Sequence, residues 1–219
     1  LDALVMRTIN NLIAETVYAD YGSGSQTAKS GIKAVNLLYL YNTNVNAGTD
    51  ITAAAALTDK DFIRFASMTM ANYIDRMKVM STLFNIGAKE RFTPEDRLHV
   101  VMLSEFKNAA NVYLQSDTFN EQYTALPNAE TVPYWQGSGT DYAFTSTGKV
   151  DVISSANHNI TISGILGIMF DREALGVTNM NPRVTTQYNA KAEFWNEWHK
   201  YDAGYFNDTN ENMVVFFAA

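Results

Sequence analysis

The 219-residue sequence contains no cysteine and only three histidines. The absence of cysteine excludes disulfide bridges, thiolate zinc sites and cysteine nucleophiles. A chain of this length buries enough apolar surface to fold without such support, as one large domain or as two lobes that share a core. Charged residues make up only 18% of the sequence. That low share fits either a large core or a surface that is largely covered by neighbouring molecules.

Positive charge is also scarce, because 16 Lys and Arg face 23 Asp and Glu, which gives a net charge of −7. This balance disfavours broad electrostatic binding of nucleic acid. Acidity is typical of plain solubility, and it would also suit the inner wall of a container for DNA. No apolar run approaches the roughly 20 residues of a membrane helix, and no signal peptide is recognisable. We therefore expect no membrane partner and no specific nucleic-acid recognition.

The sequence lacks the usual catalytic motifs. The segments Gly22-Ser23-Gly24 and Gly137-Ser138-Gly139 match neither the phosphate-binding loop nor the dinucleotide fingerprint, and no G-x-S-x-G elbow is present. None of His99, His158 and His199 has a second histidine at helical metal-binding spacing. We expect His99 in a buried strand, His158 in a turn and His199 on a strand. The sequence thus predicts no catalytic, cofactor-binding or metal-binding residues, and a protein that is not an enzyme.

Acidic residues have structural explanations. Asp59 and Asp61 favour a helix N-terminus. The run Asp208–Asn212 (DTNEN) superficially suggests a calcium loop, but it lacks the glycine and the distal Glu of that motif. Asn and Asp side chains commonly hydrogen-bond to the backbone in turns, so we interpret this run as a turn.

Helical patterns dominate the first half of the chain. Residues 1–20 have apolar residues along one side, and the glycines after Tyr21 can end such a helix. Residues 32–41 are ambiguous, with Asn36 able to cap a short helix that begins at Leu37 after an extended stretch. A short alanine-rich helix follows Thr52. Thr58 then predicts the N-cap of a longer helix that runs to about Ser81.

Strand patterns dominate the second half. Leu98–Leu103 reads as a buried strand, after which Ser104 can cap a helix over residues 105–115. A further short helix is expected at 119–126. The remaining expected strands are 131–135, 149–154, 160–170 (interrupted by Gly164 and Gly167), 183–188, 194–205 and 213–217. Helices come early, strands come late and no β–α–β repeat is present, so the fold class is α+β.

The strand predicted at 194–205 carries a dense group of aromatic residues. A platform on which nucleic-acid bases stack usually needs interleaved cations, and only Lys191 and Lys200 are near. A protein–protein contact surface is a second interpretation, because Trp and Tyr anchor such surfaces. Internal packing of a long β-ribbon is the third. The group consists of Phe194, Trp195, Trp198, Tyr201, Tyr205 and Phe206.

The order of features resembles that of a known family. An N-terminal helix, a central helix, TPEDRLHVVML (93–103), VPYWQGSG (132–139) and GILGIMFDREALGV (164–177) succeed one another, and GYFND and VVFFAA close the chain. This succession resembles the major capsid proteins of tailed bacteriophages with the HK97-type fold, in the branch of phi29-like phages of Gram-positive bacteria. The resemblance covers essentially the whole chain, and order carries it more than any single motif.

The resemblance implies a peripheral domain with a spine helix (1–51) and a long β-ribbon (171–210). It also implies an axial domain with a central mixed sheet flanked by helices (52–170), which the last strand (211–219) rejoins. The family has an N-terminal arm and an extended loop before the spine helix. Because this sequence starts at Leu1 with neither, we expect further sequence upstream and a piece that is monomeric by itself.

The resemblance also implies the function. It implies a structural subunit that assembles with itself, as pentamers and hexamers, into an icosahedral shell around genomic DNA. Scaffolding and portal proteins would be the partners, the host cytoplasm the place of assembly, and the virion capsid the destination. An encapsulin-like nanocompartment shell is the alternative, and a non-capsid enzyme or binding domain is a further one.

Overall fold

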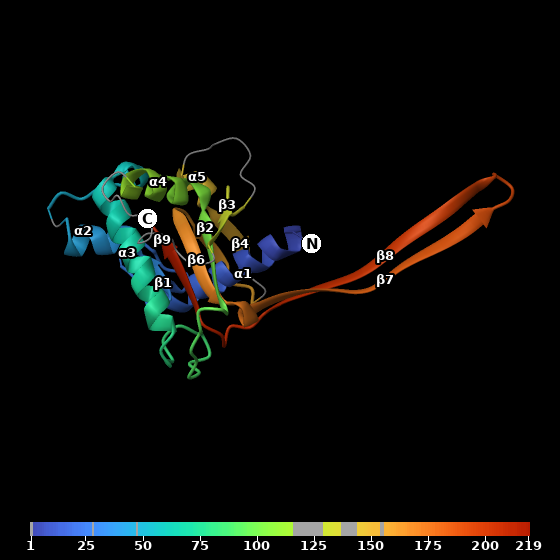
Figure 1. The fold of residues 1–219 in the computed structure, drawn as a ribbon, viewed down its shortest axis with the longest axis horizontal. Coiled ribbons are helices and arrows are strands. Elements are labelled where there is room, and N and C mark those ends of the chain that lie inside the picture. The colour runs from blue at the N-terminus through green and yellow to red at the C-terminus, as the bar shows by residue number, and fades with distance from the viewer. Residues whose placement is uncertain (1, 28, 47, 116–128, 137–143, 154–155) are drawn as a thin grey trace.

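The computed structural model describes residues 2–27, 29–46, 48–115, 129–136, 144–153 and 156–219. A body of helices and strands contains the core, and one long hairpin projects from it (Figure 1). The fold is mixed α+β, as the sequence predicts. The helical elements are α1 (Asp2–Tyr21), α2 (Leu37–Asn44), η1 (Ala56–Thr58), α3 (Lys60–Met77), α4 (Ser104–Gln115), α5 (Phe144–Thr147) and η3 (Arg172–Ala174).

The body is organised around a five-stranded sheet with the strand order β1-β9-β6-β2-β3. Its central pairs, β9 with β6 and β6 with β2, are antiparallel, whereas both outer pairs are parallel. Strands β4 and β5 form a separate pair, and β7 and β8 form the projecting hairpin. The strands are β1 (Ala34–Asn36), β2 (Leu98–Leu103), β3 (Ala129–Val132), β4 (Val150–Ile153), β5 (Asn159–Ile162), β6 (Ile165–Asp171), β7 (Leu175–Asn189), β8 (Phe194–Asn207) and β9 (Met213–Phe217).

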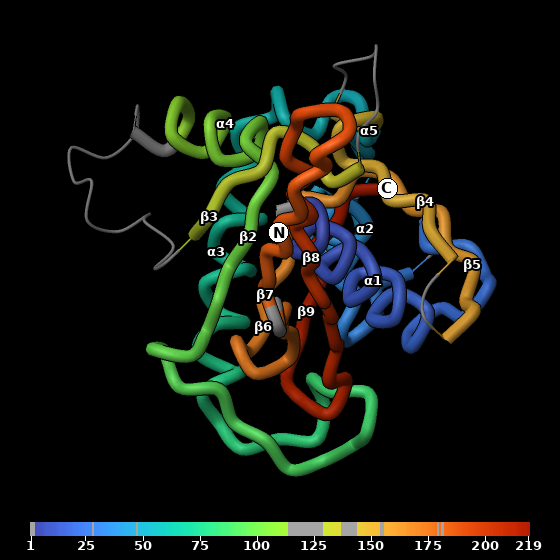
Figure 2. The backbone as a smooth tube through the Cα atoms, turned by 90° about the vertical axis from the view of Figure 1, so that its right-hand side faces the viewer, coloured from blue at the N-terminus to red at the C-terminus, as the bar shows by residue number. Residues whose placement is uncertain are grey.

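Helices cover both faces of this sheet. The ring of Tyr73 on α3 packs edge-on against Phe216, with centroids 5.3 Å apart, and Tyr21 on α1 packs against Phe217 at 5.9 Å. Because successive strand residues point to opposite faces, these contacts place α1 and α3 on opposite sides of β9. Figure 2 shows the same arrangement, with the sheet between the two helices. The fully buried strands β6 and β9 form the middle of the core.

Helix α1 is not the one-sided helix that the apolar spacing predicts. All residues from Thr8 to Val17 are buried, polar ones included. The sheet, the β4–β5 pair and the root of the hairpin surround the helix. Three of its buried polar side chains, those of Thr8, Asn10 and Thr16, donate hydrogen bonds to backbone carbonyls. Asn10 Nδ2 donates to the carbonyl of Trp135 at 2.9 Å, and the hydroxyl of Thr16 donates to the carbonyl of Leu12 at 2.7 Å. These bonds offset the cost of placing polar groups inside the core.

Two predicted helix boundaries are confirmed. Gly22 has a positive φ of 60°, and its N–H donates to the carbonyl of Tyr18 at 2.7 Å, which closes the end of α1. Asn36 caps α2, because its side-chain oxygen accepts a hydrogen bond from the N–H of Tyr39. The extended stretch before Asn36 is strand β1, which pairs with the last strand of the chain.

Other predicted boundaries are wrong in detail. The N-cap of α3 is Asp59 and not Thr58, since Asp59 Oδ1 accepts from the N–H of Phe62 at 2.7 Å, and the helix ends at Met77. The alanine run after Thr52 forms turns followed by the 3-10 helix η1. Ser104 is the first residue of α4, and its hydroxyl donates to the carbonyl of Val132 on β3. The helix expected at 119–126 lies outside the described residues.

The predicted strands also differ at their ends. Strand β3 stops at Val132, because Trp135 turns into the core, where its indole N–H donates to the carbonyl of Ile165 at 3.1 Å. The single strand expected over 160–170 is two strands, β5 and β6. Gly164 separates them with a φ of +70°, and a Cβ there would collide with the carbonyl oxygen of Ala218. Gly167 lies beside the irregularity in the β6–β9 register, as a glycine within a strand often does.

The Asp59 cap can be tested directly. We expect Asp59→Ala to lower the free energy of unfolding by about 1 kcal/mol, because the N–H of Phe62 loses its acceptor. Thr58→Ala is the matched control, since its exposed hydroxyl only donates to the carbonyl of Ala55. Urea unfolding measures both variants. A larger loss in Thr58→Ala than in Asp59→Ala would contradict this assignment of the cap.

Candidate assembly surface

The hairpin of β7 and β8 is the most unusual part of the structure. Its strands have 15 and 14 residues, which corresponds to a length of about 50 Å at ~3.4 Å per residue. It leaves the body and touches no other part of it over most of its length (Figure 1). A two-stranded hairpin alone in water is only marginally stable, because it has two open edges and no core. An uncovered arm of this kind is typical of surfaces that contact another molecule.

Local interactions shape the turn and the strands of the hairpin. At the end of β7, Asn189 Oδ1 accepts hydrogen bonds from the N–H groups of Lys191 and Ala192 in the turn. Nearer the body, one extra residue in β7 shifts the register between Met180 and Arg183. Such a bulge increases the local twist of a strand pair, and Pro182 inside it has no N–H to leave unpaired.

Both faces of the hairpin carry exposed aromatic rings. Trp195 lies opposite Tyr188, with ring centroids 5.1 Å apart, and Trp198 lies opposite Thr185. Positions 195 and 198 differ by an odd number, so the two indoles point to opposite faces. Trp195 is 70% exposed and Trp198 is 51% exposed. The third interpretation of the aromatic group, internal packing, is therefore wrong for this chain by itself, because the rings have no interior to fill.

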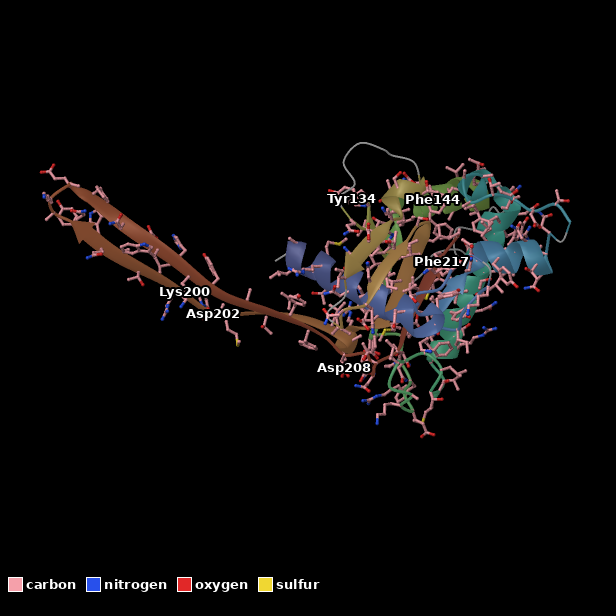
Figure 3. All side chains as sticks on the ribbon, turned by 180° about the vertical axis from the view of Figure 1, so that it is seen from behind. Tyr134, Phe144, Lys200, Asp202, Asp208 and Phe217 are labelled. Carbon is pink, nitrogen blue, oxygen red and sulfur yellow. The ribbon has the colours of Figure 1, made fainter. Side chains whose placement is uncertain are left out.

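Charge distinguishes the two remaining interpretations. Residues 175–207 contain three acidic side chains (Glu193, Glu197, Asp202) and three basic ones (Arg183, Lys191, Lys200), so their net charge is zero. Figure 3 shows Lys200 and Asp202 along the ribbon. A single-strand binding platform combines its rings with a positively charged groove. A neutral surface with exposed Trp and Tyr is typical of protein–protein contacts.

The hairpin root is held by the central sheet. Strand β6 leads into the hairpin and β9 leads out of it, and these two strands are neighbours. The N–H of Asp171 donates to the carbonyl of Asn212 at 2.9 Å, and the N–H of Asp208 donates to the carbonyl of Ala174 at 2.7 Å. Asn207 Nδ2 donates to the carbonyl of Thr8 at 3.3 Å and ties the root to α1.

An ionic cluster lies at the same root. Asp171 is fully buried, and its carboxylate accepts from Arg97 Nη2 at 2.7 Å, from the hydroxyl of Thr93 and from the N–H of Glu173. Arg97 Nη1 also lies 3.3 Å from Glu173. Burial disfavours the charge on Arg97, but the hydrogen bond and the charge of Asp171 outweigh this and raise the pKa of the guanidinium. Arg97 thus neutralises the buried carboxylate that ends β6.

The same cluster contains the one group of carboxylates in the described residues that is arranged closely enough to hold a cation. Ligand oxygens of Asp171, Glu173 and Glu211 lie within 4.8 Å of one another. Arg97 already pairs with Asp171, and Arg91 Nη2 lies 3.3 Å from Glu211. Burial raises the pKa of Glu211, and the charge of Arg91 opposes that shift. Two guanidinium groups therefore supply the positive charge that a metal would bring, and the absence of a metal site stays a prediction.

The three histidines are not brought together. His99 lies on β2 against Phe170, with Nε2 3.5 Å from Glu130. The ring of His158 stacks on Tyr18 at 3.5 Å just before β5, and its Nδ1 lies 3.1 Å from Glu15. His199 is on β8 beside Glu197. His99 and His199 lie on strands as expected, although His99 is half-buried and not fully buried, and His158 lies in the loop just before β5 and not in a turn.

The run Asp208–Asn212 is the expected turn. Asp208 Oδ1 accepts from the backbone N–H of Asn210 at 2.9 Å and from its side chain at 2.8 Å. These bonds lower the pKa of the Asp208 carboxyl, with burial opposing them. No helix among the described residues is long and apolar enough to cross a bilayer.

Comparison with known proteins identifies the family of the chain. A family model described as "Phi29-like phage major capsid protein" matches residues 6–217. The chain belongs to the family of Phi29-like phage major capsid proteins. A search of curated proteins finds no match.

Two solved structures are similar to the chain. One is reported as the capsid structure of Staphylococcus phage Andhra, with 13% identity over 76% of this chain and a TM-score of 0.43. The other comes from the structure of the head fiber and inner core protein gp22 of native bacteriophage P68, with 8% identity over 99% of this chain and a TM-score of 0.56. At such low identity the second likeness concerns the fold alone. The chain spans 57% and 60% of the lengths of those two chains.

Sequence reasoning missed the root cluster. Asp171, Arg97 and Glu211 are far apart in the sequence, and only the topology brings them together. A signal was available at Asp171, a charged residue at the end of the apolar run Ile165–Phe170, since a buried charge needs a partner.

The first prediction for this region concerns Asp171. We expect Asp171→Ala to lower the free energy of unfolding by about 2–4 kcal/mol, because Arg97 and Thr93 lose a buried acceptor. This range of free energies is set below the full cost of breaking a buried ion pair, because about a third of the Arg97 side chain is exposed and solvent screens its charge. Glu173→Ala, at a largely exposed carboxylate, should cost less than about 1 kcal/mol. Urea unfolding compares the two, and equal losses would show that the cluster is not organised around Asp171.

The second prediction concerns pH. Because the pKa of Asp208 is lowered in the folded chain, its contribution to stability is complete above the usual value of 3.8 and is lost as pH falls through the lowered value. Asp208→Asn should therefore reduce the loss of stability between about pH 5 and about pH 2. Thermal unfolding across that range measures the effect, with Asp202→Asn on the exposed hairpin as control. Identical pH profiles for wild type and Asp208→Asn would contradict it.

Proposed function

We propose that this chain is the shell-building part of a capsid subunit that assembles with copies of itself into a closed icosahedral shell around phage DNA. The observation that carries the proposal is the hairpin β7–β8, which exposes aromatic rings on both faces and lies outside the core. Membership of the Phi29-like phage major capsid protein family supports it. The role is structural, and we propose that the protein performs no catalysis.

The physical reason is that the hairpin is incomplete as part of a monomer. Its rings are large apolar groups left in water, and covering each would contribute about 1.5–3 kcal/mol. A projecting arm that contacts a different surface of the next copy makes a heterologous contact, and such contacts close into rings. Each contact can be modest, because many act together in a shell.

We propose the remaining features on the same basis. Pentamers and hexamers are the expected rings, scaffolding and portal proteins are the expected partners, and assembly takes place in the bacterial cytoplasm before the subunit resides in the virion capsid. The division into a peripheral domain (1–51 and 171–210) and an axial domain (52–170 and 211–219), in the manner of the HK97-type fold, also belongs to the proposal.

The test uses the complete reading frame, expressed with any adjacent scaffold gene and examined by negative-stain electron microscopy. Wild type should give closed shells of uniform diameter, and their contents distinguish a DNA container from a cargo compartment. The double variant Trp195→Ser/Trp198→Ser should give soluble subunits with at least a tenfold lower yield of shells, since it removes two aromatic anchors.

Met68→Ser is the matched control, because Met68 is a similarly exposed apolar residue on α3. Circular dichroism should give the same folded signal for all three proteins. If wild type forms only small particles in the presence of scaffold, the proposed function fails. If the double variant assembles as well as wild type, the function stands and the role of the hairpin fails.

A further inference from the structure

The surface of the body contains a groove. It has a volume of about 470 Å³ and lies between the N-terminal half of α1, the segment around Trp135 and strand β4. Both α1 and β4 lie on the side of the body from which the hairpin leaves (Figure 1). Its lining includes Met6, Arg7, Tyr134, Val152 and Ile153.

The floor of the groove is fixed. Asn10 is 8% exposed, and its Nδ2 donates a hydrogen bond to the carbonyl of Trp135 at 2.9 Å. Trp135 itself is fully buried and bonded to β6 through its indole N–H. The groove is therefore a preformed feature of the folded chain, as binding sites usually are.

Two apolar side chains at the groove are exposed. Ile153 is 67% exposed and Tyr134 is 46% exposed. Figure 3 shows Tyr134 on the outside of the body. Side chains of this kind are placed in water at a cost unless another surface covers them.

Backbone pairing with a guest strand is blocked at the middle of β4. Gln136 Nε2 donates to the carbonyl of Asp151 at 2.8 Å, and Gln136 Oε1 accepts from the N–H of Asp151 at 2.6 Å. The carboxamide thereby occupies the place that an added strand would take. A guest in this groove must bind through its side chains and not by extending the sheet.

The tip of the hairpin offers matching side chains. Tyr188 and Trp195 form an exposed aromatic pair on one face, and Glu197 follows Trp195 on the same face. In the groove, Arg7 forms no ion pair with any described residue and lies 5.8 Å from the ring of Tyr205 at the hairpin root. The groove thus places apolar side chains beside a cation, and the hairpin tip places aromatic side chains beside a carboxylate.

We infer that the groove of one subunit receives the aromatic tip of the hairpin of a second copy, with Trp195 covering Ile153 and Tyr134 and with Glu197 reaching Arg7. The tip lies far from α1 and β4 of its own chain (Figure 1), so the contact joins two molecules. Two different surfaces meet, which makes the contact heterologous and able to close a ring. The inference rests on the proposed function and identifies the surface that the hairpin contacts.

These 219 residues contain no cysteine, so cross-linking tests the contact once any cysteine elsewhere in the reading frame is replaced by serine. Trp195→Cys and Ile153→Cys are introduced together in the complete reading frame, and the assembled shells are treated with a short bismaleimide. We expect covalent multimers of the subunit on a denaturing gel. Trp195→Cys paired with Val112→Cys, an equally exposed position on α4, is the control and should leave single chains.

Each other outcome overturns the inference. Multimers from Trp195→Cys alone would mean that two tips meet each other. Single chains in normal shells of the double variant would mean that a different segment covers the groove. Failure of wild type to form shells is a separate result, which counts against the proposed function itself.

If the cysteine variants do not assemble, exchanging the charges of Arg7 and Glu197 tests the same contact. Arg7→Glu and Glu197→Arg should each reduce the yield of shells at least fivefold, and the two together should restore at least half of it. Asp202→Arg, at a carboxylate farther from the tip, should not be rescued by Arg7→Glu. No rescue in the Arg7→Glu/Glu197→Arg double variant would overturn the inference.

Discussion

The antiparallel pairing of β6 and β9 is the constraint on which the rest of the structure depends. Both strands are fully buried at the middle of the sheet, and their register fixes Ile165 opposite Phe217 and Phe170 opposite Met213. The chain between them has no room within the sheet, because β2 and β1 occupy the other sides. The segment between β6 and β9 therefore leaves the sheet and forms the hairpin β7–β8. Two fully buried strands thus set the direction of the hairpin, and the Arg97–Asp171 pair lies where β6 leads into it.

The hairpin itself has the opposite character. The body closes its sheet with helices on both faces, whereas the hairpin has no layer above or below it. A fixed root and an uncovered arm are a suitable combination for assembly. The root sets the direction of the contact, and the arm keeps its apolar surface for a partner.

Much of the fold could be predicted from the sequence where a local signal decides the structure. The N-cap at Asn36, the glycine end of α1, the buried strand β2, the last strand β9 and the turn at Asp208 all depend on nearby residues, and all are confirmed. Predictions failed where distant parts of the chain compete. The middle of helix α1 is buried on every side, because β4, β5 and the hairpin root pack around it. The polar side chains on this helix predict an exposed face, although they are buried and hydrogen-bonded inside the core.

The candidate surface was predicted only in part. The aromatic group was recognised, but sequence alone left open whether the rings pack internally, stack on bases or contact protein. Strand β7 was expected to begin at Arg183, whereas it begins at Leu175 and passes through a bulge between Met180 and Arg183. The extra length turns an ordinary ribbon into a projecting arm. The groove combines α1, Trp135 and β4, which no local pattern connects.

Amide hydrogen exchange tests the central claim, that the hairpin is completed by other copies of the chain. The account predicts that amides of residues 175–207 exchange quickly in the isolated chain and become strongly protected in assembled shells, while those of β6 and β9 are protected in both. Equal exchange of residues 175–207 in the two states would contradict it, because the hairpin would then have no partner in the shell.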